Sequence, residues 1–281
     1  MRSTELSSKS NNNNEVYLTV LTNEDYIRGV KALKRSLKQV KTKHDLVVLV
    51  PKSKEKELVG ILEKAGIPDK HCKIKVKEDI QVEYPEELHF EQHYWANTFF
   101  KLRAADCTEY KKIILLDSDM LILHNIDHLF EKPNYSAVIA GHCGEPEYLK
   151  LNSGLMVLEP SEALFNKLLD SIRPAMYRRF SEGYNIGDQD VFIEAFKGWE
   201  EHPELILPEI YNCFYRFIRV LAEQEHIRPT DISVIHFVGK VKPWSSGCFT
   251  KHNIRQCLSY IKHRQFYELK IFFRYLLDAA L

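Results

Sequence analysis

The sequence predicts an α/β fold with a mostly parallel central sheet. Apolar, strand-like runs alternate with segments of helical spacing through the first part of the chain, and such alternation is typical of βαβ units. The runs at 45–50 and 113–116 are apolar almost throughout, as expected for strands buried on both faces. The 281 residues are 44% hydrophobic and 28% charged, which predicts a globular protein rather than a disordered or fibrous one.

Local patterns assign the elements of the first half in order. Residues 15–22 (EVYLTVLT) are rich in β-branched and aromatic residues, whereas the apolar residues from Tyr26 to Leu37 recur at helical spacing. Pro51 stops the apolar run before it. The expected order is strand 15–22, helix from Tyr26, strand 45–50, helix through Leu58, strand 73–77, helix 95–107 and strand 111–119.

The alternation is weaker beyond residue 130. Strands are expected at 137–141, 153–160 and 233–239, and a helix at 161–172. The last stretch, 253–281, is amphipathic and places Lys and Arg among aromatic residues, which predicts helical structure. We expect it to pack on the protein, although a membrane-surface or partner-binding helix has the same pattern.

We expect three parts along the chain. Residues 1–14 are rich in Ser, Lys and Asn and lack apolar periodicity, which predicts a disordered tail. Residues 15–245 contain no linker and no internal repeat, which predicts one domain. Residues 246–281 are expected to form a helical extension packed on that domain.

Composition excludes several classes of function. The 39 Lys and Arg balance the 39 Asp and Glu, whereas nucleic-acid-binding proteins generally carry a basic excess, so no nucleic-acid partner is expected. The six cysteines form no CxxC pair, which fits free thiols in a reducing compartment. No apolar run is long enough for a signal peptide or a transmembrane segment. We expect a cytoplasmic protein, with unconventional secretion as the alternative.

Two carboxylates follow the apolar run at 113–116. Asp117 and Asp119 flank Ser118, and ligands of open α/β sheets bind beyond the carboxyl ends of the strands. Paired carboxylates at such a place need a cationic partner, and a divalent metal with hard oxygen ligands is the natural one. The alternative is a solvated turn, because Asp and Ser are common turn formers.

The segment HFVGKVKPW at 236–244 adds complementary groups. The imidazole of His236 is a ligand for Mn²⁺, and Gly239 lets the backbone approach phosphate oxygens closely. Lys242 supplies a positive charge for a departing diphosphate. Taken alone, His236 is equally consistent with a histidine that merely ends a strand.

Together these segments resemble a known family, the glycogenin-like retaining glycosyltransferases of family GT8, which includes galactinol synthases. Four motifs stand in the family's order: VLTNEDYIRG at 20–29, LLDSDMLILHNIDHLF at 115–130, LNSGLMVLEP at 151–160 with GDQD at 187–190, and HFVGKVKPW at 236–244. The resemblance covers residues 15–245. It implies a GT-A fold, a Rossmann-like domain that binds a nucleotide sugar, usually a UDP-sugar, together with Mn²⁺; Mg²⁺ is the alternative ion.

The resemblance also implies roles for individual residues. The implied metal ligands are Asp117, Asp119 and His236. The implied donor-binding residues are Thr22, Asn23 and Tyr26 at the uridine, Lys101, Gly239 and Lys242 at the diphosphate, and Ser118 and Asn152. Two of them have a simpler explanation, because Tyr26 also begins the apolar stripe of a helix and Lys101 has the pattern of a surface lysine.

The implied catalytic residues are Asp188, Gln189 and Lys242. Asp188 and Gln189 lie in the GDQD motif, which with Asn152 faces the donor sugar in the family; capping or turn formation is the alternative for Asn152 and Asp188. Retention of configuration needs either a carboxylate nucleophile or front-face attack, in which the departing phosphate accepts the acceptor's proton. Asp188 is the only acidic candidate in the matched motifs, and we favour front-face attack.

Two positions depart from the glycogenin pattern. Arg219 stands where glycogenins have the tyrosine that they glucosylate, although Tyr211 and Tyr215 are near it in sequence. Asn185 replaces an acidic residue ahead of GDQD. We therefore do not expect self-glucosylation at that position. The stretches at 83–103 and 125–130 are closer to galactinol synthases, whose acceptor is a free polyol.

The sequence thus predicts Mn²⁺-dependent transfer of a hexose, glucose first, from a UDP-sugar to a hydroxyl of a sugar, polyol or protein-linked glycan. Galactinol-synthase-like transfer of galactose to a polyol is the first alternative. A UDP-sugar hydrolase, an inactive nucleotide-sugar-binding protein and a membrane-surface scaffold are the others. A homodimer is compatible with the sequence, and the motifs do not encode the identity of sugar or acceptor.

Overall fold

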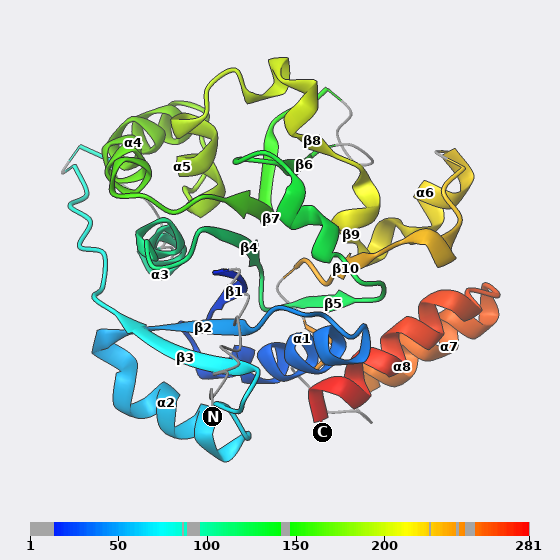
Figure 1. Ribbon diagram of the computed structural model, residues 1–281. Helices are drawn as coiled ribbons and strands as arrows, with labels where there is room; N and C mark the ends of the chain where they lie inside the picture. Colours follow the sequence, from blue (N-terminus) through cyan, green and yellow to red (C-terminus); the bar gives the residue numbers. More distant parts are fainter. Residues whose placement is uncertain are drawn as a thin grey trace, which may run out of the picture.

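The fold follows the predicted alternation of strands and helices (Figure 1). The computed structural model describes residues 14–85, 87–88, 96–141, 147–224, 226–239, 242–244 and 251–280, so the predicted disordered tail lies outside the described residues except for Asn14. The strands are β1 (Glu15–Val20), β2 (Leu46–Pro51), β3 (Cys72–Lys77), β4 (Lys112–Leu116), β5 (Met120–Ile122), β6 (Ala137–Ile139), β7 (Leu151–Leu158), β8 (Ile206–Leu207), β9 (Cys213–Phe214) and β10 (Val234–His236). The helices are α1 (Ile27–Gln39), α2 (Glu55–Lys64), α3 (Ala96–Phe99), α4 (Glu162–Ser181), α5 (Asp188–Ala195), α6 (Ile218–Gln224), α7 (Lys251–Lys262) and α8 (Phe266–Ala280).

A seven-stranded sheet in the order β3-β2-β1-β4-β7-β6-β8 forms the centre of the molecule. The strands β3, β2, β1 and β4 are parallel, whereas β7 is antiparallel to both of its neighbours. Every residue of β2 and of β7 is buried, as expected of strands covered on both faces. The predicted α/β fold with a mostly parallel sheet is therefore confirmed.

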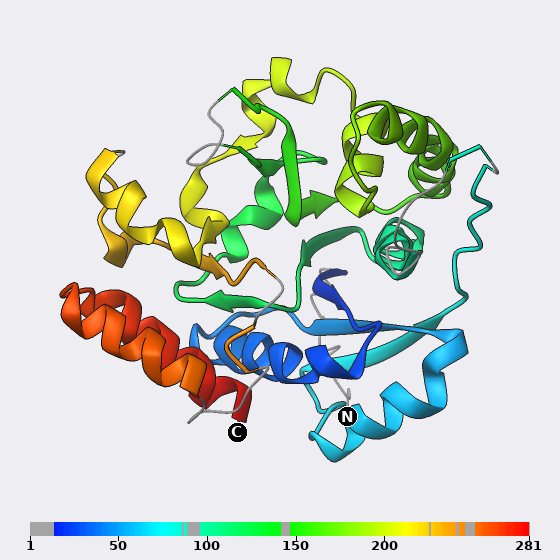
Figure 2. The ribbon, with the colours of Figure 1, turned by 180° about the vertical axis from the view of Figure 1, so that it is seen from behind.

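Helices cover both faces of this sheet. Successive side chains of a strand point to opposite faces. In β1, Val16 and Leu18 accordingly pack in a core with α3, α4 and α5, whereas Tyr17 packs in a second core with α1 and α2. Figures 1 and 2 show α1 and α2 on one side of the sheet and α3 to α5 on the other. The two cores together fix the positions of the strand ends, where the polar motifs begin.

A small second sheet, in the order β5-β10-β9, follows the end of β4. β5 is antiparallel to β10, and β9 is parallel to it. β5 has three residues and β9 has two, so neither is long enough to give a recognisable pattern, and neither is among the predicted strands. This sheet brings the segment after Asp119 beside the segment that ends at His236.

Three helical regions differ from the prediction. The expected helix at 95–107 is the short α3 followed by a 3₁₀ helix, Phe100–Asp106. α4 continues through Pro174 to Ser181, beyond the expected end at residue 172. Pro174 removes one helical hydrogen bond, but Ile172 and Met176, on either side of it, are buried in the same core, so packing maintains the helix. The C-terminal stretch forms two helices rather than one, and Arg264, between α7 and α8, has a positive φ of 56°.

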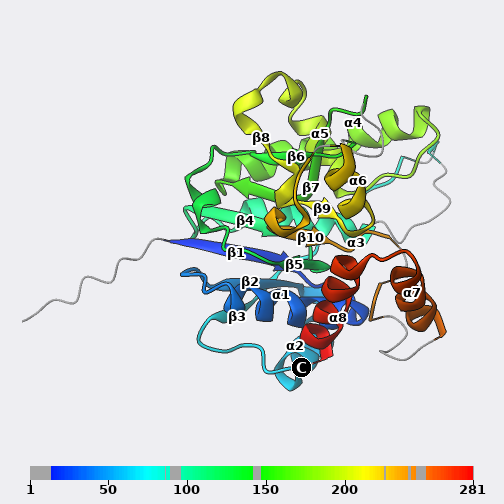
Figure 3. The same ribbon diagram turned by 90° about the vertical axis from the view of Figure 1, so that its right-hand side faces the viewer.

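The last helix packs along the first one (Figure 3). Tyr275 of α8 is fully buried in a core that includes Ala32 of α1. Asp278 lies 2.9 Å from the guanidinium of Arg35 and accepts a hydrogen bond from Gln39 Nε2 at 3.0 Å. Both partners belong to α1, so apolar and polar contacts together hold α8 on it. None of the helices in the described part of the chain combines the length and the apolar character that crossing a membrane requires.

Candidate metal and nucleotide-sugar site

Two sheet contacts bring the predicted metal ligands together. β4 ends directly before Asp117, whose backbone N–H donates to the carbonyl of Gly154 in β7 at 2.8 Å. The antiparallel register of β5 and β10 pairs Met120 with His236. Because Met120 directly follows Asp119, His236 is fixed beside the two aspartates although it is far from them in sequence.

Asp117, Asp119 and His236 each place one ligand atom within 4.8 Å of the others. His236 Nε2 lies 3.1 Å from Asp119 Oδ1 and 3.6 Å from Asp117 Oδ2. The side chains of Asp119 and His236 are 8% exposed, whereas that of Asp117 is 30% exposed, so the cluster is open on the Asp117 side. Two carboxylate oxygens and an imidazole nitrogen are ligands that suit Mn²⁺, with substrate oxygens to complete its coordination. The three residues therefore fit the implied metal.

Asn212 sets the orientation of the His236 ring. The backbone N–H of Gly154 donates to Asn152 Oδ1 at 2.8 Å, which identifies that atom as the amide oxygen. Asn212 accordingly directs its Nδ2 to Asn152 Oδ1 at 2.7 Å and its Oδ1 to His236 Nδ1 at 2.9 Å. Because an amide oxygen only accepts, His236 Nδ1 carries a proton, and Nε2 is the ring nitrogen that faces the carboxylates. A second layer of hydrogen bonds thus orients His236 as a metal ligand.

Lys101 connects Asp117 with the GDQD motif. It is 4% exposed, so the alternative of a surface lysine is wrong. Its ammonium group lies 2.5 Å from Asp117 Oδ1 and 3.1 Å from Asp188 Oδ2. Ser153 donates its hydroxyl to Asp188 Oδ2 at 2.8 Å and its backbone N–H to Gln189 Oε1 at 3.3 Å. Lys101 therefore bridges two carboxylates, and its contact with a donor phosphate stays a prediction.

Lys242 makes the corresponding contact with the other aspartate. Its ammonium group donates to Asp119 Oδ2 and, at 2.9 Å, to the carbonyl of Phe237. It also lies 5.6 Å from the centre of the Tyr26 ring, in a cation–π arrangement. Burial lowers the pKa of Lys242, but the carboxylate of Asp119 outweighs burial and the pKa is raised. Lys242 is therefore held as a cation at the edge of the cluster.

The two aspartates differ in how well their charges are compensated. Burial raises the pKa of both. At Asp119, His236 and Lys242 outweigh burial and hold the pKa well below its usual range. At Asp117, Lys101 does not offset burial, and the pKa is raised. With the first aspartate of the GDQD motif, which also contacts Lys101, three carboxylates face two ammonium groups. A divalent cation would compensate the remaining negative charge.

Tyr26 and Trp244 border a pocket of about 470 Å³ next to the cluster. Their rings meet edge to face with 6.0 Å between centres, and Trp244 Nε1 donates to the carbonyl of Asp25 at 2.7 Å. Lys242 lines the same pocket. An aromatic-edged cavity is therefore continuous with an ammonium group that contacts Asp119, and such a cavity can hold a planar base with its phosphates directed to the lysine.

Three other predicted donor-binding residues have hydrogen bonds or conformations of their own. Asn23 Oδ1 accepts from the backbone N–H of Asp25 at 2.9 Å and so caps the first helical turn. The carbonyl of Thr22 accepts from Lys54 Nζ at 2.7 Å. Gly239 has a φ of 119°, which favours glycine. These hydrogen bonds do not involve the carboxylate cluster, so the roles of the three residues stay predictions.

Two glycines let backbone segments approach the cluster closely. A Cβ added to Gly29 of α1 would lie 2.4 Å from the carbonyl oxygen of Ser118, and one added to Gly154 of β7 would lie 2.7 Å from His236 Cε1. Neither position accommodates a side chain without displacement of a neighbour. Both glycines interrupt an otherwise regular helix or strand pattern, and such an interruption is the sequence signal for close approach.

Ser153 and Asn212 were not predicted from the sequence as site residues. Ser153 lies inside a quoted motif, and its neighbours there, Asn152 and Gly154, both take part in the site. Asn212 follows a tyrosine in a segment with no periodicity and no motif. It is 3% exposed, and only the pairing of β9 with β10 places it beside His236.

Comparisons with known proteins agree with this geometry. The family model described as Glycosyl transferase family 8 matches residues 17–248. UDP-glucuronate:xylan alpha-glucuronosyltransferase 2 of Arabidopsis thaliana is 30% identical over 238 residues, which cover 82% of this chain and 35% of that protein. Glycogenin-1 of Caenorhabditis elegans is 28% identical over 246 residues, which cover 86% of this chain and 54% of that protein. This chain thus spans only part of the length of these relatives.

A solved structure shows the same arrangement of elements. The galactosyltransferase LgtC, in complex with donor and acceptor sugar analogues, aligns with a TM-score of 0.55 over 86% of this chain and 93% of its own. Its sequence is 16% identical, so the likeness concerns the fold alone. Together the matches confirm the predicted GT-A fold and the resemblance to glycogenin-like glycosyltransferases.

Proposed function

Since the chain belongs to glycosyl transferase family 8, we propose that it transfers a hexose, glucose first, from a UDP-sugar to a hydroxyl acceptor with retention of configuration. The observation that carries this proposal is the convergence of Asp117, Asp119 and His236 on one point. This point adjoins a pocket edged by Tyr26 and Trp244. The family and its glycosyltransferase relatives support an enzyme of the hexosyltransferase class.

In this proposal, Asp117, Asp119 and His236 hold Mn²⁺, with Mg²⁺ as the alternative. When bound, the ion supplies Lewis-acid stabilisation of the diphosphate. Lys242 exchanges its contact with Asp119 for a phosphate oxygen and stabilises the negative charge that develops on the departing UDP. Lys101 keeps Asp117 in position.

The proposed reaction is a front-face attack, which needs no carboxylate nucleophile. The bond between the anomeric carbon and the phosphate oxygen breaks, and the acceptor oxygen forms the new bond to the same carbon. The proton of the acceptor hydroxyl passes to the departing diphosphate oxygen, which balances the step. Asp188 already bonds Lys101 and Ser153 through Oδ2, and this supports a positioning role for Asp188, with Gln189 beside it, over a nucleophilic one.

Galactose transfer to a polyol is the second candidate, because the stretches at 83–103 and 125–130 are closer to galactinol synthases. A UDP-sugar hydrolase would use the same metal ligands with water as acceptor. In this proposal, residues 15–245 form the catalytic domain and residues 246–281 form its helical extension. The proposal also keeps the cytoplasmic location expected from the sequence.

A donor screen tests the proposed function. The protein is incubated with UDP-glucose, UDP-galactose, UDP-N-acetylglucosamine and UDP-xylose, with and without Mn²⁺, and released UDP is measured by chromatography, water serving as acceptor when no other is added. We expect Mn²⁺-dependent release from one preferred donor, lost in Asp117→Asn. The matched control is Asp170→Asn, the same change at an exposed aspartate of α4. Absence of release from every donor, or equal release by the two variants, would refute the proposal.

A further inference from the structure

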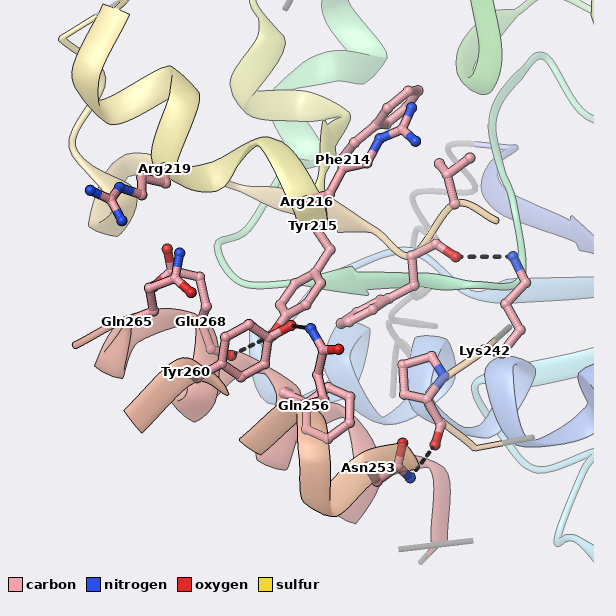
Figure 4. Close-up of a pocket in the computed structure, with 14 residues that line it drawn as sticks. Phe214, Tyr215, Arg216, Arg219, Lys242, Asn253, Gln256, Tyr260, Gln265 and Glu268 are labelled. Carbon is pink, nitrogen blue, oxygen red and sulfur yellow. Dashed lines mark hydrogen bonds between the residues drawn. The ribbon is translucent and has the colours of Figure 1, made fainter. Parts of the chain in front are cut away.

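A pocket of about 320 Å³ opens between the segment after β9 and the helices α7 and α8 (Figure 4). It shares Lys242 with the pocket edged by Tyr26. Phe214, which lines it, meets the ring of His236 edge to face, with 5.6 Å between ring centres. The pocket therefore adjoins the carboxylate cluster, where the proposed function places the metal ion and the diphosphate of the donor.

Stacked aromatic rings form one wall of this pocket. Phe237 lies between Tyr215 and Tyr275, with ring centres 4.8 and 4.0 Å apart. The hydroxyl of Tyr215 donates to the carbonyl of Glu268 on α8 at 2.8 Å. The wall is therefore fixed by contacts on both sides, and it gives the pocket an apolar side.

Polar groups surround this wall. Gln256 bonds the hydroxyl of Tyr260, and Gln265 and Glu268 lie near each other at the side of Arg219 (Figure 4). A side-chain amide donates to and accepts from hydroxyls, whereas a carboxylate accepts from them. The volume is at the lower end of the range for small-molecule sites, roughly 300–1,000 Å³, which suits one sugar or polyol ring.

The pocket also carries positive charge. Arg216 lies over the rings of Phe214 and Phe217, 5.9 and 4.7 Å from their centres. Its guanidinium makes no hydrogen bond or ion pair with another residue that the structure describes, so its N–H groups are available to a ligand. Arg219 pairs with Glu223 at 2.6 Å. The pocket thus has one guanidinium group that is held in place and lacks an anionic partner among the described side chains.

A larger pocket of about 640 Å³ beside Gln189 is less suited to an anionic ligand. Its basic side chains already have carboxylate partners. Arg179 lies 3.0 Å from Asp190, and Lys197 lies 2.5 Å from Glu194. An anion bound there would have to displace these carboxylates, whereas an anion bound by Arg216 displaces none that the structure describes.

We propose that the pocket between β9 and the C-terminal helices binds the acceptor, and that the acceptor is a small sugar or polyol bearing a phosphate or carboxylate group. Arg216 binds the anionic group through paired hydrogen bonds. The aromatic wall and Gln256 hold the ring. One hydroxyl then forms the bond to the anomeric carbon and passes its proton to the departing diphosphate. This inference rests on the proposed function, because it needs the donor at the carboxylate cluster.

Matched pairs of compounds test the inference by thermal shift in the presence of Mn²⁺ and UDP. The pairs are glucose 6-phosphate with glucose, glucuronate with glucose, and myo-inositol 1-phosphate with myo-inositol. The variant is Arg216→Ala, and the matched control is Arg228→Ala, an exposed arginine whose partner is Asp231. We expect at least one anionic compound to bind wild type and Arg228→Ala, and to bind its neutral counterpart and Arg216→Ala roughly tenfold more weakly or worse. The phosphate and carboxylate arms identify the anionic group.

Three results would overturn the inference: no shift with any anionic compound, an equal shift with the neutral counterparts, or an unchanged shift in Arg216→Ala. The shift caused by Mn²⁺ and UDP alone separates this inference from the proposed function. Its absence from wild type contradicts the proposed function itself. Its loss only in Arg216→Ala assigns the pocket to the donor and overturns the acceptor assignment.

Discussion

Replacement of Asn212 by alanine tests how the second layer of hydrogen bonds supports the metal ligand. The change removes the hydrogen bonds of 2.7 and 2.9 Å to Asn152 and His236. Loss of an outer-shell partner of a ligating histidine lowers metal affinity by about 10–100-fold. That factor corresponds to roughly 1.4–2.7 kcal/mol. The variant also leaves the buried Nδ1–H of His236 without an acceptor, which lowers the free energy of unfolding by about 1–3 kcal/mol.

The affinity for Mn²⁺ is measured by isothermal titration calorimetry with and without UDP, and stability by thermal unfolding. Asn212→Asp keeps an oxygen that accepts from His236 Nδ1, so we expect it to retain more Mn²⁺ affinity than Asn212→Ala. Its second oxygen faces Asn152 Oδ1 without a hydrogen between them, so we expect less affinity than in wild type. Asn134→Ala is the control, because it removes an amide that bonds the backbone N–H of Glu159 outside the cluster. An Mn²⁺ affinity of Asn212→Ala within twofold of wild type would refute the reasoning.

The remaining predictions concern packing, charge and thiol reactivity. Gly154→Ala places a Cβ 2.7 Å from His236 Cε1, so we expect destabilisation by about 1–3 kcal/mol, seen as a lower Tm; an unchanged Tm would contradict this. In the metal-free protein at pH 7, Asp119→Asn should lower the free energy of unfolding by about 1–3 kcal/mol, because the charge of Asp119 is hydrogen-bonded in the fold. Asp117→Asn should not lower it, because the fold raises the pKa of Asp117 and so disfavours its charged form. The folded pKa of Asp119 is lowered, so its stabilising effect is present above the unfolded pKa of about 3.9 and is lost as the pH falls below that value; a difference in Tm that is constant from pH 7 to pH 3 would argue against this. Burial raises the pKa of the Cys72 thiol to about 12, so iodoacetamide at pH 8 should not label it in the native protein, and mass spectrometry showing labelling as fast as in urea would be the contrary result.

The strands of the large sheet could be predicted because burial on both faces leaves a direct mark on sequence. β2 and β4 are runs of apolar residues. The expected strand 45–50 is one residue from β2, and the expected strand 111–119 contains β4 but ends three residues beyond it. β5 could not be predicted in this way, since its three residues are too few to show the pattern of a strand. Its pairing with β10 depends on the tertiary structure, yet that pairing places His236 beside Asp119.

The candidate site was predictable to a similar extent. The metal ligands belong to short motifs whose residue types indicate their chemistry. Lys101 was assigned by resemblance alone, because its burial depends on the way in which α3 and the following 3₁₀ helix pack against α4. Asn212 gave no signal, because one buried asparagine in an irregular segment resembles any turn residue. The break between α7 and α8 likewise lacks a glycine or proline, since the positive φ belongs to Arg264.

The measurement that tests the central claim most directly is Mn²⁺ binding followed by electron paramagnetic resonance, with and without UDP. It compares wild type, His236→Ala and the control Asp170→Asn. The account predicts that wild type and the control bind Mn²⁺, that UDP tightens this binding, and that His236→Ala loses both effects. Equal Mn²⁺ affinity and equal tightening by UDP in His236→Ala would show that the ion binds elsewhere and would contradict the assignment of Asp117, Asp119 and His236 as its ligands.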